Sequence, residues 1–192
     1  MPKDHSKKPP GEVRIIGGLW KRTPLQVTLA PGLRPTPSRV RETLFNWLGQ
    51  DLTGWQCADV FAGTGALGLE AASRGAAQVW MFETHPQALL QLRRNVEKLK
   101  AQAVKPVQAD GLSGLAGLPS HALDLIFLDP PFEASCHEHA LELARLCIKP
   151  TGWVYLEAGE QWTASRLAQM GWQLHRHVHA GMAHAHLMHP IA

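Results

Sequence analysis

The sequence predicts an α/β fold in which a mostly parallel sheet is covered by helices on both faces. From Cys57 onward, short apolar runs alternate with segments of helical period, and such alternation produces parallel sheets. Glycine-rich or acidic segments follow four of the predicted strands, where open α/β sheets bind ligands. The chain of 192 residues, 45% hydrophobic and 18% charged, is long enough for one globular domain with a sizeable core.

Hydrophobic periodicity and turn residues give the individual elements. The predicted strands are Cys57 to Ala62, Gln78 to Glu83, Val104 to Asp110, Leu123 to Leu128 and Trp153 to Ala158. The predicted helices are Ala66 to Arg74, Pro86 to Lys100, about Cys136 to Ile148, and Ala164 to Met170. An antiparallel hairpin is predicted from Trp172 to His189, because the residues alternate with period two about Ala180-Gly181-Met182.

Basic residues are concentrated near the N-terminus. Residues 1–41 hold nine Lys/Arg and two Asp/Glu, a net charge of +7, whereas residues 42–192 hold ten and fourteen, a net charge of −4. A basic arm on an acidic body indicates a polyanionic partner. The predicted division is a disordered basic tail (1–12), a basic β-hairpin extension (13–33) and a main domain (34–192).

The hairpin extension is predicted from a strand, a Gly17-Gly18 turn and a second strand ending at Arg22. A helix then starts at Pro37, capped by Thr36, with Val40, Leu44, Trp47 and Leu48 as its buried stripe. Candidate nucleic-acid contacts in this part, by charge or by stacking, are Arg14, Trp20, Lys21, Arg22, Arg34, Arg39 and Arg41. The alternatives are a hairpin that only caps the sheet and arginines that are plain solvated charges.

Several classes of protein are not supported. No apolar run approaches the roughly 20 residues of a membrane span, and the N-terminal segment lacks the apolar stretch of a secretory signal. Three scattered cysteines without metal-type spacing predict a reduced, cytoplasmic setting. His175, His177 and His179 are expected on one face of the terminal hairpin, but no acidic or cysteine ligand accompanies them, so no metal site is predicted.

A glycine-rich turn after the first strand predicts a nucleoside cofactor. Gly63 and Gly65 allow close approach of a ligand to the backbone, and Glu83 ends the second strand where an acid can accept both ribose hydroxyls. This pattern alone fits NAD as well as S-adenosylmethionine. The alternative to a cofactor site is a glycine turn that is needed only for close packing. Asp59 favours S-adenosylmethionine, because a carboxylate suits its ammonium group and not a pyrophosphate. Asp110, which ends the third strand, can accept from an adenine amine.

The segment Asp129-Pro130-Pro131-Phe132 follows the most apolar strand. Two prolines cannot extend a strand, so a rigid turn is predicted at its carboxyl end. Asp129 and the Pro130 carbonyl offer acceptors to an exocyclic amine, and Phe132 offers a stacking face for its base. Hydride transfer has no use for this cluster, which predicts methylation of a nucleobase amine.

The sequence resembles the RsmD family of bacterial small-subunit ribosomal RNA methyltransferases. The segments that carry the resemblance are Arg14 to Gly18, Arg34 to Thr36, Arg39 to Leu48, Asp59 to Gly75, Glu83, Asp110 and Asp129 to Phe132. Thr84-His85-Pro86 departs from the charged continuation expected after Glu83, and the tail is unusually rich in histidine.

The resemblance implies a Rossmann-like, class I S-adenosylmethionine-dependent methyltransferase fold. It implies transfer of a methyl group to the N2 amine of a guanine that is flipped into the Asp129–Phe132 pocket, in ribosomal RNA of an assembled or assembling small subunit. A monomer is expected, because nothing in the sequence demands a dimer. Asp129, Pro130 and Phe132 would be catalytic, and the cofactor would contact Asp59, Phe61, Gly63, Gly65, Glu83, Asp110 and Asp129. The alternatives are an adenine-N6 methyltransferase, a non-catalytic RNA-binding assembly factor and an NAD-dependent oxidoreductase.

Overall fold

The structure is a computed structural model that describes residues 12–27, 38–131 and 135–191. The strands of these ranges are β1 (Glu12–Arg14), β2 (Pro24–Gln26), β3 (Gln56–Asp59), β4 (Gln78–Glu83), β5 (Val104–Gln108), β6 (Leu123–Leu128), β7 (Ile148–Ala158), β8 (Trp172–Ala180) and β9 (Ala183–Pro190). The helices are α1 (Ser38–Trp47), α2 (Ala66–Ser73), α3 (Pro86–Leu99), α4 (Gly111–Ala116), α5 (His137–Cys147) and α6 (Ala164–Gln169).

Seven strands form one sheet in the order β5-β4-β3-β6-β7-β9-β8. The five from β5 to β7 are parallel, and β9 and β8 add an antiparallel hairpin at one edge. The predicted α/β fold with its C-terminal hairpin is therefore confirmed. Successive connections run outward from β3 towards β5 and then return to β6 on its other side. The β3–β6 boundary is thus the topological switch point, where open sheets of this kind bind ligands.

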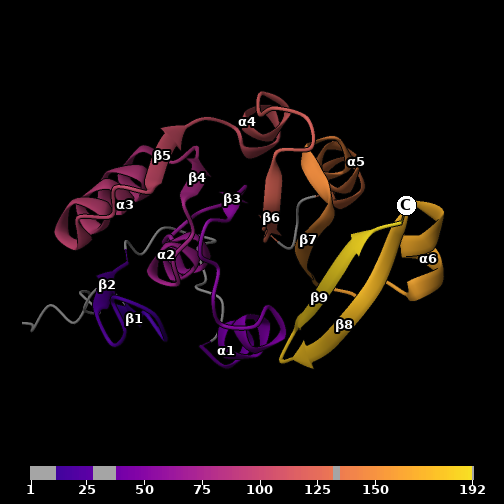
Figure 1. The fold of residues 1–192 in the computed structure, drawn as a ribbon, viewed down its shortest axis with the longest axis horizontal. Coiled ribbons are helices and arrows are strands. Elements are labelled where there is room, and N and C mark those ends of the chain that lie inside the picture. The colour runs from indigo at the N-terminus through magenta and orange to yellow at the C-terminus, as the bar shows by residue number, and fades with distance from the viewer. Residues whose placement is uncertain (1–11, 28–37, 132–134, 192) are drawn as a thin grey trace, which may run out of the picture.

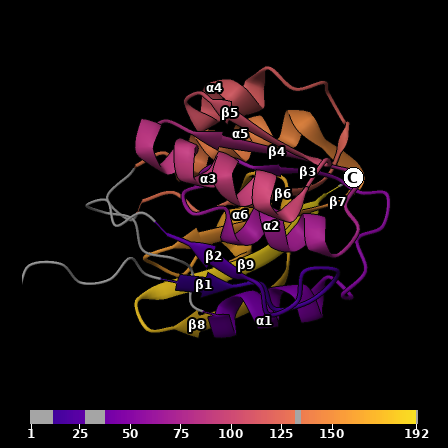
Figure 2. The ribbon, with the colours of Figure 1, turned by 90° about the vertical axis from the view of Figure 1, so that its left-hand side faces the viewer.

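Helices cover the two faces of the sheet and give two apolar layers (Figure 1). On one face α1, α2, α3 and the β1–β2 hairpin bury a cluster that includes Phe45, Leu69 and Phe127. On the other face α4, α5 and α6 pack on residues such as Ile126 and Trp172. Figure 2, viewed from the β5 side, shows the β1–β2 hairpin beside α1. The central strand β6 is buried on both faces, which explains its nearly unbroken apolar sequence.

The N-terminal hairpin differs from the prediction in its strands. Gly17 and Gly18 lie in the connection, and β1 pairs with β2 at Pro24–Gln26 instead of with the residues directly after the glycines. Gly18 has φ of 70°, and a Cβ there would lie 1.9 Å from the Ser73 carbonyl oxygen. Leu19 N donates to that oxygen at 2.7 Å. The glycines therefore serve to dock the connection onto the C-terminal end of α2.

A buried carboxylate on α2 fixes this connection. Glu70 is fully buried and accepts from Ile16 N at 2.8 Å, from Gly17 N at 2.7 Å and from Arg74 Nη2 at 2.8 Å. Arg41 Nη1 lies 3.8 Å from the same carboxylate and donates to the Arg14 carbonyl at 3.0 Å. Arg41 is thus buried in the scaffold, contrary to the expectation of a phosphate contact or a solvated charge. The α1 stripe likewise buries Arg41 and Phe45, while Trp47 is only partly covered.

The predicted C-terminal hairpin is present, but its histidines divide between the two faces of the sheet. A register shift between Leu174 and Arg176 moves His175 to the side of Trp153, with 4.9 Å between ring centroids. His177 instead lies beside His186, at 4.7 Å. A single bulge therefore breaks the period-two pattern that placed His175, His177 and His179 together.

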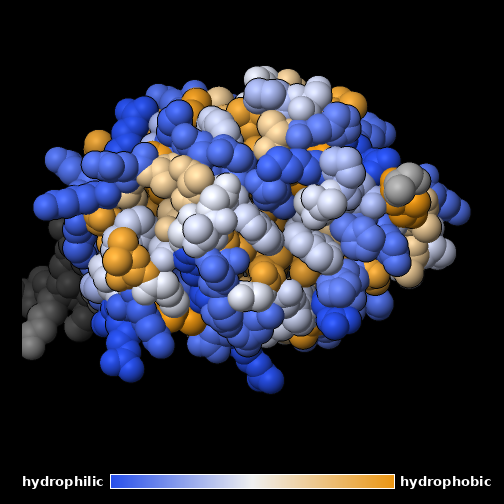
Figure 3. Space-filling model, in the orientation of Figure 1, coloured by the Kyte–Doolittle hydropathy of each residue, from blue (hydrophilic) through white to orange (hydrophobic). Residues whose placement is uncertain are grey.

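The visible face in Figure 3 is mostly hydrophilic, with separate small apolar areas. Within the described ranges, no helix is long and apolar enough to cross a membrane.

We expect Glu70→Ala to lower the free energy of unfolding by about 3–5 kcal/mol, because it leaves Arg74 and two backbone donors buried without their acceptor. Urea denaturation at neutral pH measures this. The matched control, Glu97→Ala, removes an exposed glutamate from α3 and should change the free energy by less than about 0.5 kcal/mol. Equal effects of the two substitutions would contradict the role of Glu70.

Candidate functional site

Strand register brings the predicted acidic residues to one edge of the sheet. Asp59 on β3 is level with Met81 on β4 and with Phe127 on β6, so Glu83 and Asp129 each lie two residues further along. Glu83 is in turn level with Gln108 on β5, two residues before Asp110. The four carboxylates therefore end or follow four neighbouring parallel strands, on both sides of the switch point.

The glycine turn connects β3 to α2 and lies beside Asp59. Gly63 and Gly65 have φ of 49° and 81°, and a Cβ on Gly65 would lie 2.5 Å from Leu92 Cδ1. Gly68 N donates to Asp59 Oδ2 at 2.9 Å. Glycine is therefore favoured at position 65 by its left-handed conformation and by the nearby side chain of Leu92, and Asp59 is held against the first turn of α2.

Asp59 is almost completely buried, with 1% of its surface exposed. Burial raises its pKa to about 7, the hydrogen bond from Gly68 N opposes this rise, and the neighbouring Glu83 adds to it. A buried acid that titrates near neutral pH is typical of a ligand site. A cationic group placed beside Asp59 would stabilise the ionised carboxylate. Such a carboxylate is the partner that the ammonium group of an amino acid requires.

Glu83 and Asp110 are held by short local contacts. His85 N donates to Glu83 Oε1 at 2.7 Å. Asp110 caps α4 by accepting from Ser113 N and Oγ, both at 2.9 Å, and these bonds lower the pKa of its carboxyl group. A Cβ on Gly111 would lie 1.9 Å from the Val60 carbonyl oxygen, so α4 starts directly against the end of β3. Helix α4, which the hydrophobic pattern of the sequence does not predict, positions Asp110 in this way.

The structure describes the first three residues of the Asp129–Phe132 corner that follows β6. Asp129 is half-buried, Pro130 is buried and Pro131 is exposed, whereas Phe132 lies outside the described residues. Beside this corner, Tyr155 on β7 donates its hydroxyl to Glu157 Oε2 at 2.7 Å. The pKa of Tyr155 is raised by burial first, and then by the charges of Glu157 and Asp129.

Glu157 was not among the predicted site residues. It is level with the residue after Leu128 and is buried, which raises the pKa of its carboxyl group, while the Tyr155 hydroxyl opposes that rise. The signal that identifies it is an acid directly after the apolar run 153–156, near the end of β7. Phe61 is half-buried and packs at the margin of the second apolar layer.

The predicted nucleic-acid contacts that the structure describes fall into three groups. Arg14, Lys21, Arg22 and Arg39 are exposed, Trp20 is half-buried against the core, and Arg41 is buried. Arg34 lies outside the described residues. The connection that bears Trp20 and Lys21 docks at the C-terminal end of α2, about 12 Å along the helix from the glycine turn.

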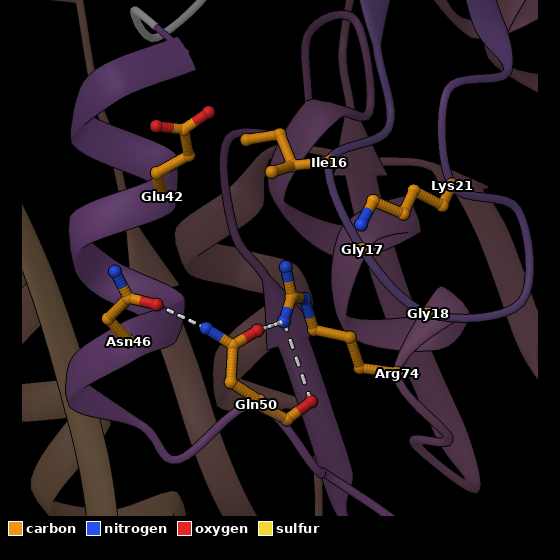
Figure 4. Close-up of a pocket in the computed structure, with 8 residues that line it drawn as sticks. All are labelled: Ile16, Gly17, Gly18, Lys21, Glu42, Asn46, Gln50 and Arg74. Carbon is orange, nitrogen blue, oxygen red and sulfur yellow. Dashed lines mark hydrogen bonds between the residues drawn. The ribbon is translucent and has the colours of Figure 1, made fainter.

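A polar hollow of about 390 Å³ lies between this connection and α1. Figure 4 shows Gln50 between Asn46 and Arg74, bonded to both, and Lys21 on the opposite wall. Arg74 is at the end of α2 remote from Gly65, so this hollow is separate from the acidic edge of the sheet. In the ranges the structure covers, no group of three or more His, Cys, Asp or Glu side chains is arranged to hold a metal ion.

A nucleoside cofactor with an amino-acid end fits the residues present. The buried acid at Asp59, the glycine turn, and the successive acids Glu83 and Asp110 supply partners for an ammonium, a ribose and an adenine amine, in that order along the edge. The sheet order and this edge define a class I methyltransferase fold. The chain belongs to the family described as "Conserved hypothetical protein 95", whose model matches residues 13–189. The resemblance to the RsmD family is confirmed.

Relatives in Escherichia coli and Haemophilus influenzae carry the name "Ribosomal RNA small subunit methyltransferase D". The protein of Escherichia coli (strain K12) is 41% identical over 179 residues, 89% of this chain and 86% of the relative. The protein of Haemophilus influenzae is 40% identical over 166 residues, 82% of this chain and 84% of the relative.

Solved structures agree with this assignment. The "putative methyltransferase yhhF" of Escherichia coli has a TM-score of 0.81 at 39% identity and covers 95% of this chain and 99% of its own. The "putative methylase HI0767" of Haemophilus influenzae has a TM-score of 0.77 at 31% identity, covering 95% and 100%.

We expect Asp59→Asn to stabilise the cofactor-free protein at pH 8 by about 1–3 kcal/mol. The folded pKa of Asp59 lies above its unfolded value, so the folded state binds the extra proton and loses stability as the pH rises from about 4 towards 7. The amide removes this loss and still accepts from Gly68 N. Denaturation at pH 4 and pH 8 measures the effect. Asp110→Asn is the control with a pKa shift of opposite sign, and it should give no gain at pH 8.

Proposed function

We propose that this protein transfers a methyl group from S-adenosylmethionine to the exocyclic N2 amine of a guanine in small-subunit ribosomal RNA. The observation that carries the proposal is the position of the Asp129-Pro130 corner. It follows β6 at the same edge as the glycine turn after β3, on the adjacent strand. The relatives named as small-subunit ribosomal RNA methyltransferases support the substrate class.

The proposed cofactor contacts lie along the acidic edge. Asp59 would hold the ammonium group, the turn at Gly63 and Gly65 would allow close approach of the ligand, and Glu83 would accept from the ribose hydroxyls. The remaining proposed contacts are Phe61, Asp110 and Asp129. When bound, S-adenosylmethionine supplies an electrophilic methyl group, so the protein needs neither a metal nor a covalent intermediate.

The task of the protein is to prepare the amine, whose lone pair is delocalised into the guanine ring. If the Asp129 carboxylate and the Pro130 carbonyl each accept one N–H, the amine is drawn towards tetrahedral geometry and its lone pair is aimed at the methyl donor. Positioning of this kind can contribute up to about 7–11 kcal/mol. Phe132 would stack on the flipped base and recover about 1–3 kcal/mol of the few kcal/mol that unstacking costs.

The RNA is proposed to meet the exposed cations of the N-terminal region. Arg14, Lys21, Arg22 and Arg39 are exposed, and Arg34 extends the set by its position in the basic arm. Arg41 is left out, because its buried guanidinium serves the Glu70 cluster. The half-buried Trp20 retains a proposed stacking role. The proposed enzyme is a cytoplasmic monomer whose substrate is ribosomal RNA in an assembled or assembling small subunit.

We expect Asp129→Ala to lower kcat by about 10²- to 10³-fold, the loss typical for one aligned polar group in a transition state. Affinity for S-adenosylhomocysteine should fall much less than kcat, because the six other proposed cofactor contacts remain. Asp129→Asn should keep measurable activity, because an amide oxygen still accepts from the amine. Transfer of labelled methyl groups to unmethylated small subunits measures kcat. An Asn variant as inactive as Ala would replace the acceptor mechanism by general-base catalysis, and labelling of adenine would redirect the proposal to that base.

We expect Lys21→Gln/Arg22→Gln to weaken RNA binding and to reduce the slope of log K against log salt by about 0.7–0.9 for each lost phosphate contact. Fluorescence titrations between low and moderate salt measure this slope. Arg93→Gln/Arg94→Gln on α3 removes the same charge from exposed positions and serves as the control. An unchanged slope in the first double variant would leave the connection with a purely structural role.

A further inference from the structure

Four histidines of the C-terminal hairpin form a column of nearly parallel rings. Ring centroids are separated by 4.2 Å between His179 and His184, 5.3 Å between His184 and His177, and 4.7 Å between His177 and His186. The corresponding interplanar angles are 16°, 8° and 28°. The column therefore runs in the order His179, His184, His177, His186, from the tip of the hairpin towards its middle.

The inner end of the column is anchored in the core. His186 is fully buried, its Nε2 accepts from Trp162 N at 3.0 Å, and its Nδ1 lies 3.3 Å from the Leu156 carbonyl oxygen. Because Nε2 is the acceptor, Nδ1 carries the proton and donates to that oxygen. Burial lowers the pKa of His186 to about 4, so this ring is neutral under ordinary conditions. Because this neutral ring has hydrogen bonds at both nitrogens, it fixes the inner end of the column.

The outer end of the column is exposed and lies at the acidic edge of the sheet. Strand register aligns one residue from each of β6, β7, β9 and β8 in a row across the sheet: Leu128, Leu156, His186 and His177. Asp129 and His179 both lie beyond this row, towards the carboxyl ends of the parallel strands. Three strand spacings separate β6 from β8, about 14 Å. The exposed ring of His179 thus stands at the edge that carries the Asp129-Pro130 corner.

The hairpin that carries the column presents no acidic side chain to a polyanion. Residues 172–192 contain six histidines and Arg176 but no Asp or Glu. The acids that follow or end β7 at this edge are occupied: Glu160 pairs with Arg166 at 2.8 Å, and Glu157 accepts from Tyr155. The rings of His177 and His184 are joined by a 3.0 Å contact between Nε2 and Nδ1, which requires one donor and one acceptor. The pKa of each is lowered by burial first, which favours uncharged rings.

We propose that the outer ring, His179, stacks on an unpaired base of the RNA that flanks the methylated nucleotide, so that the base continues the column. This inference rests on the proposed function, since it assigns a second contact to the same RNA. Stacking on an aromatic face tolerates any base and adds no ion pair. The contact is therefore distinguishable from those of Lys21 and Arg22, which change the salt dependence.

The test compares three variants with the wild type at pH 7.5. We expect His179→Ala to weaken binding of unmethylated small-subunit ribosomal RNA, and to raise KM for the subunit, by about five- to tenfold, with kcat and the salt slope unchanged. His179→Phe should restore binding to within about twofold, because a phenyl ring stacks without hydrogen bonds or charge. His175→Ala, which removes an exposed histidine of the same strand on the other face, is the matched control.

The inference is overturned if His179→Ala binds RNA like the wild type, or if His179→Phe is as weak as His179→Ala. Thermal melting of each variant verifies that the hairpin remains folded. Binding is measured directly, so a protein that binds RNA through His179 but transfers no methyl group would overturn the proposed function alone. Normal methylation with an unaffected His179→Ala variant would overturn only the stacking contact.

Discussion

The structure depends on the junction between β3 and β6, two neighbouring parallel strands whose following segments turn to opposite faces of the sheet. After β3 the chain enters the glycine turn and α2, and after β6 two prolines force it away from the sheet. The helices that follow the two strands pack on opposite faces, so the polar groups at both strand ends lie at the same edge of the sheet. A cofactor acid on one strand and an acceptor pair on the next are thereby placed side by side.

The buried carboxylates differ in how they are compensated, and this difference separates scaffold from site. Glu70 receives bonds from two backbone N–H groups and from Arg74, and it fixes the N-terminal hairpin on α2. Asp59 is equally buried, yet its pKa is raised to about 7 because burial outweighs the bond from Gly68 N. Stability is reduced at such a position, and a cationic ligand would supply the missing compensation. The candidate site thus lies where the protein does not fully compensate a buried carboxylate.

Much of this arrangement was predictable from the sequence. The strand and helix pattern from Cys57 onward predicted the sheet, and the acids at the ends of four strands were predicted to share one edge. Strand register confirms the shared edge for Asp59, Glu83 and Asp129. Glu83 and Asp129 each lie two residues beyond the level of Asp59, and side chains two residues apart lie on the same side of a strand. The identity of the ligands that these residues meet is a separate matter and remains a proposal.

The differences arose where a distant contact overrides a local pattern. The Gly17-Gly18 pair predicts a hairpin tip, but glycine at position 18 is required by the approach to Ser73, which is far away in sequence. Arg41 is predicted as a phosphate contact, with a solvated charge as the alternative, but Glu70 provides a buried partner that helical periodicity does not reveal. The bulge before Arg176 divided the histidines between two faces, and no turn residue in the sequence marks it. The short helix α4 lacks a long apolar stripe and depends on the Asp110 cap.

The most direct measurement is a crystal structure of this protein with S-adenosylhomocysteine. The account predicts that the amino-acid end lies against Asp59, the ribose hydroxyls against Glu83 and the adenine amine near Asp110, with the thioether sulfur facing the Asp129-Pro130 corner. A ligand bound instead in the hollow lined by Lys21 and Gln50, or a corner that faces away from the sulfur, would contradict it.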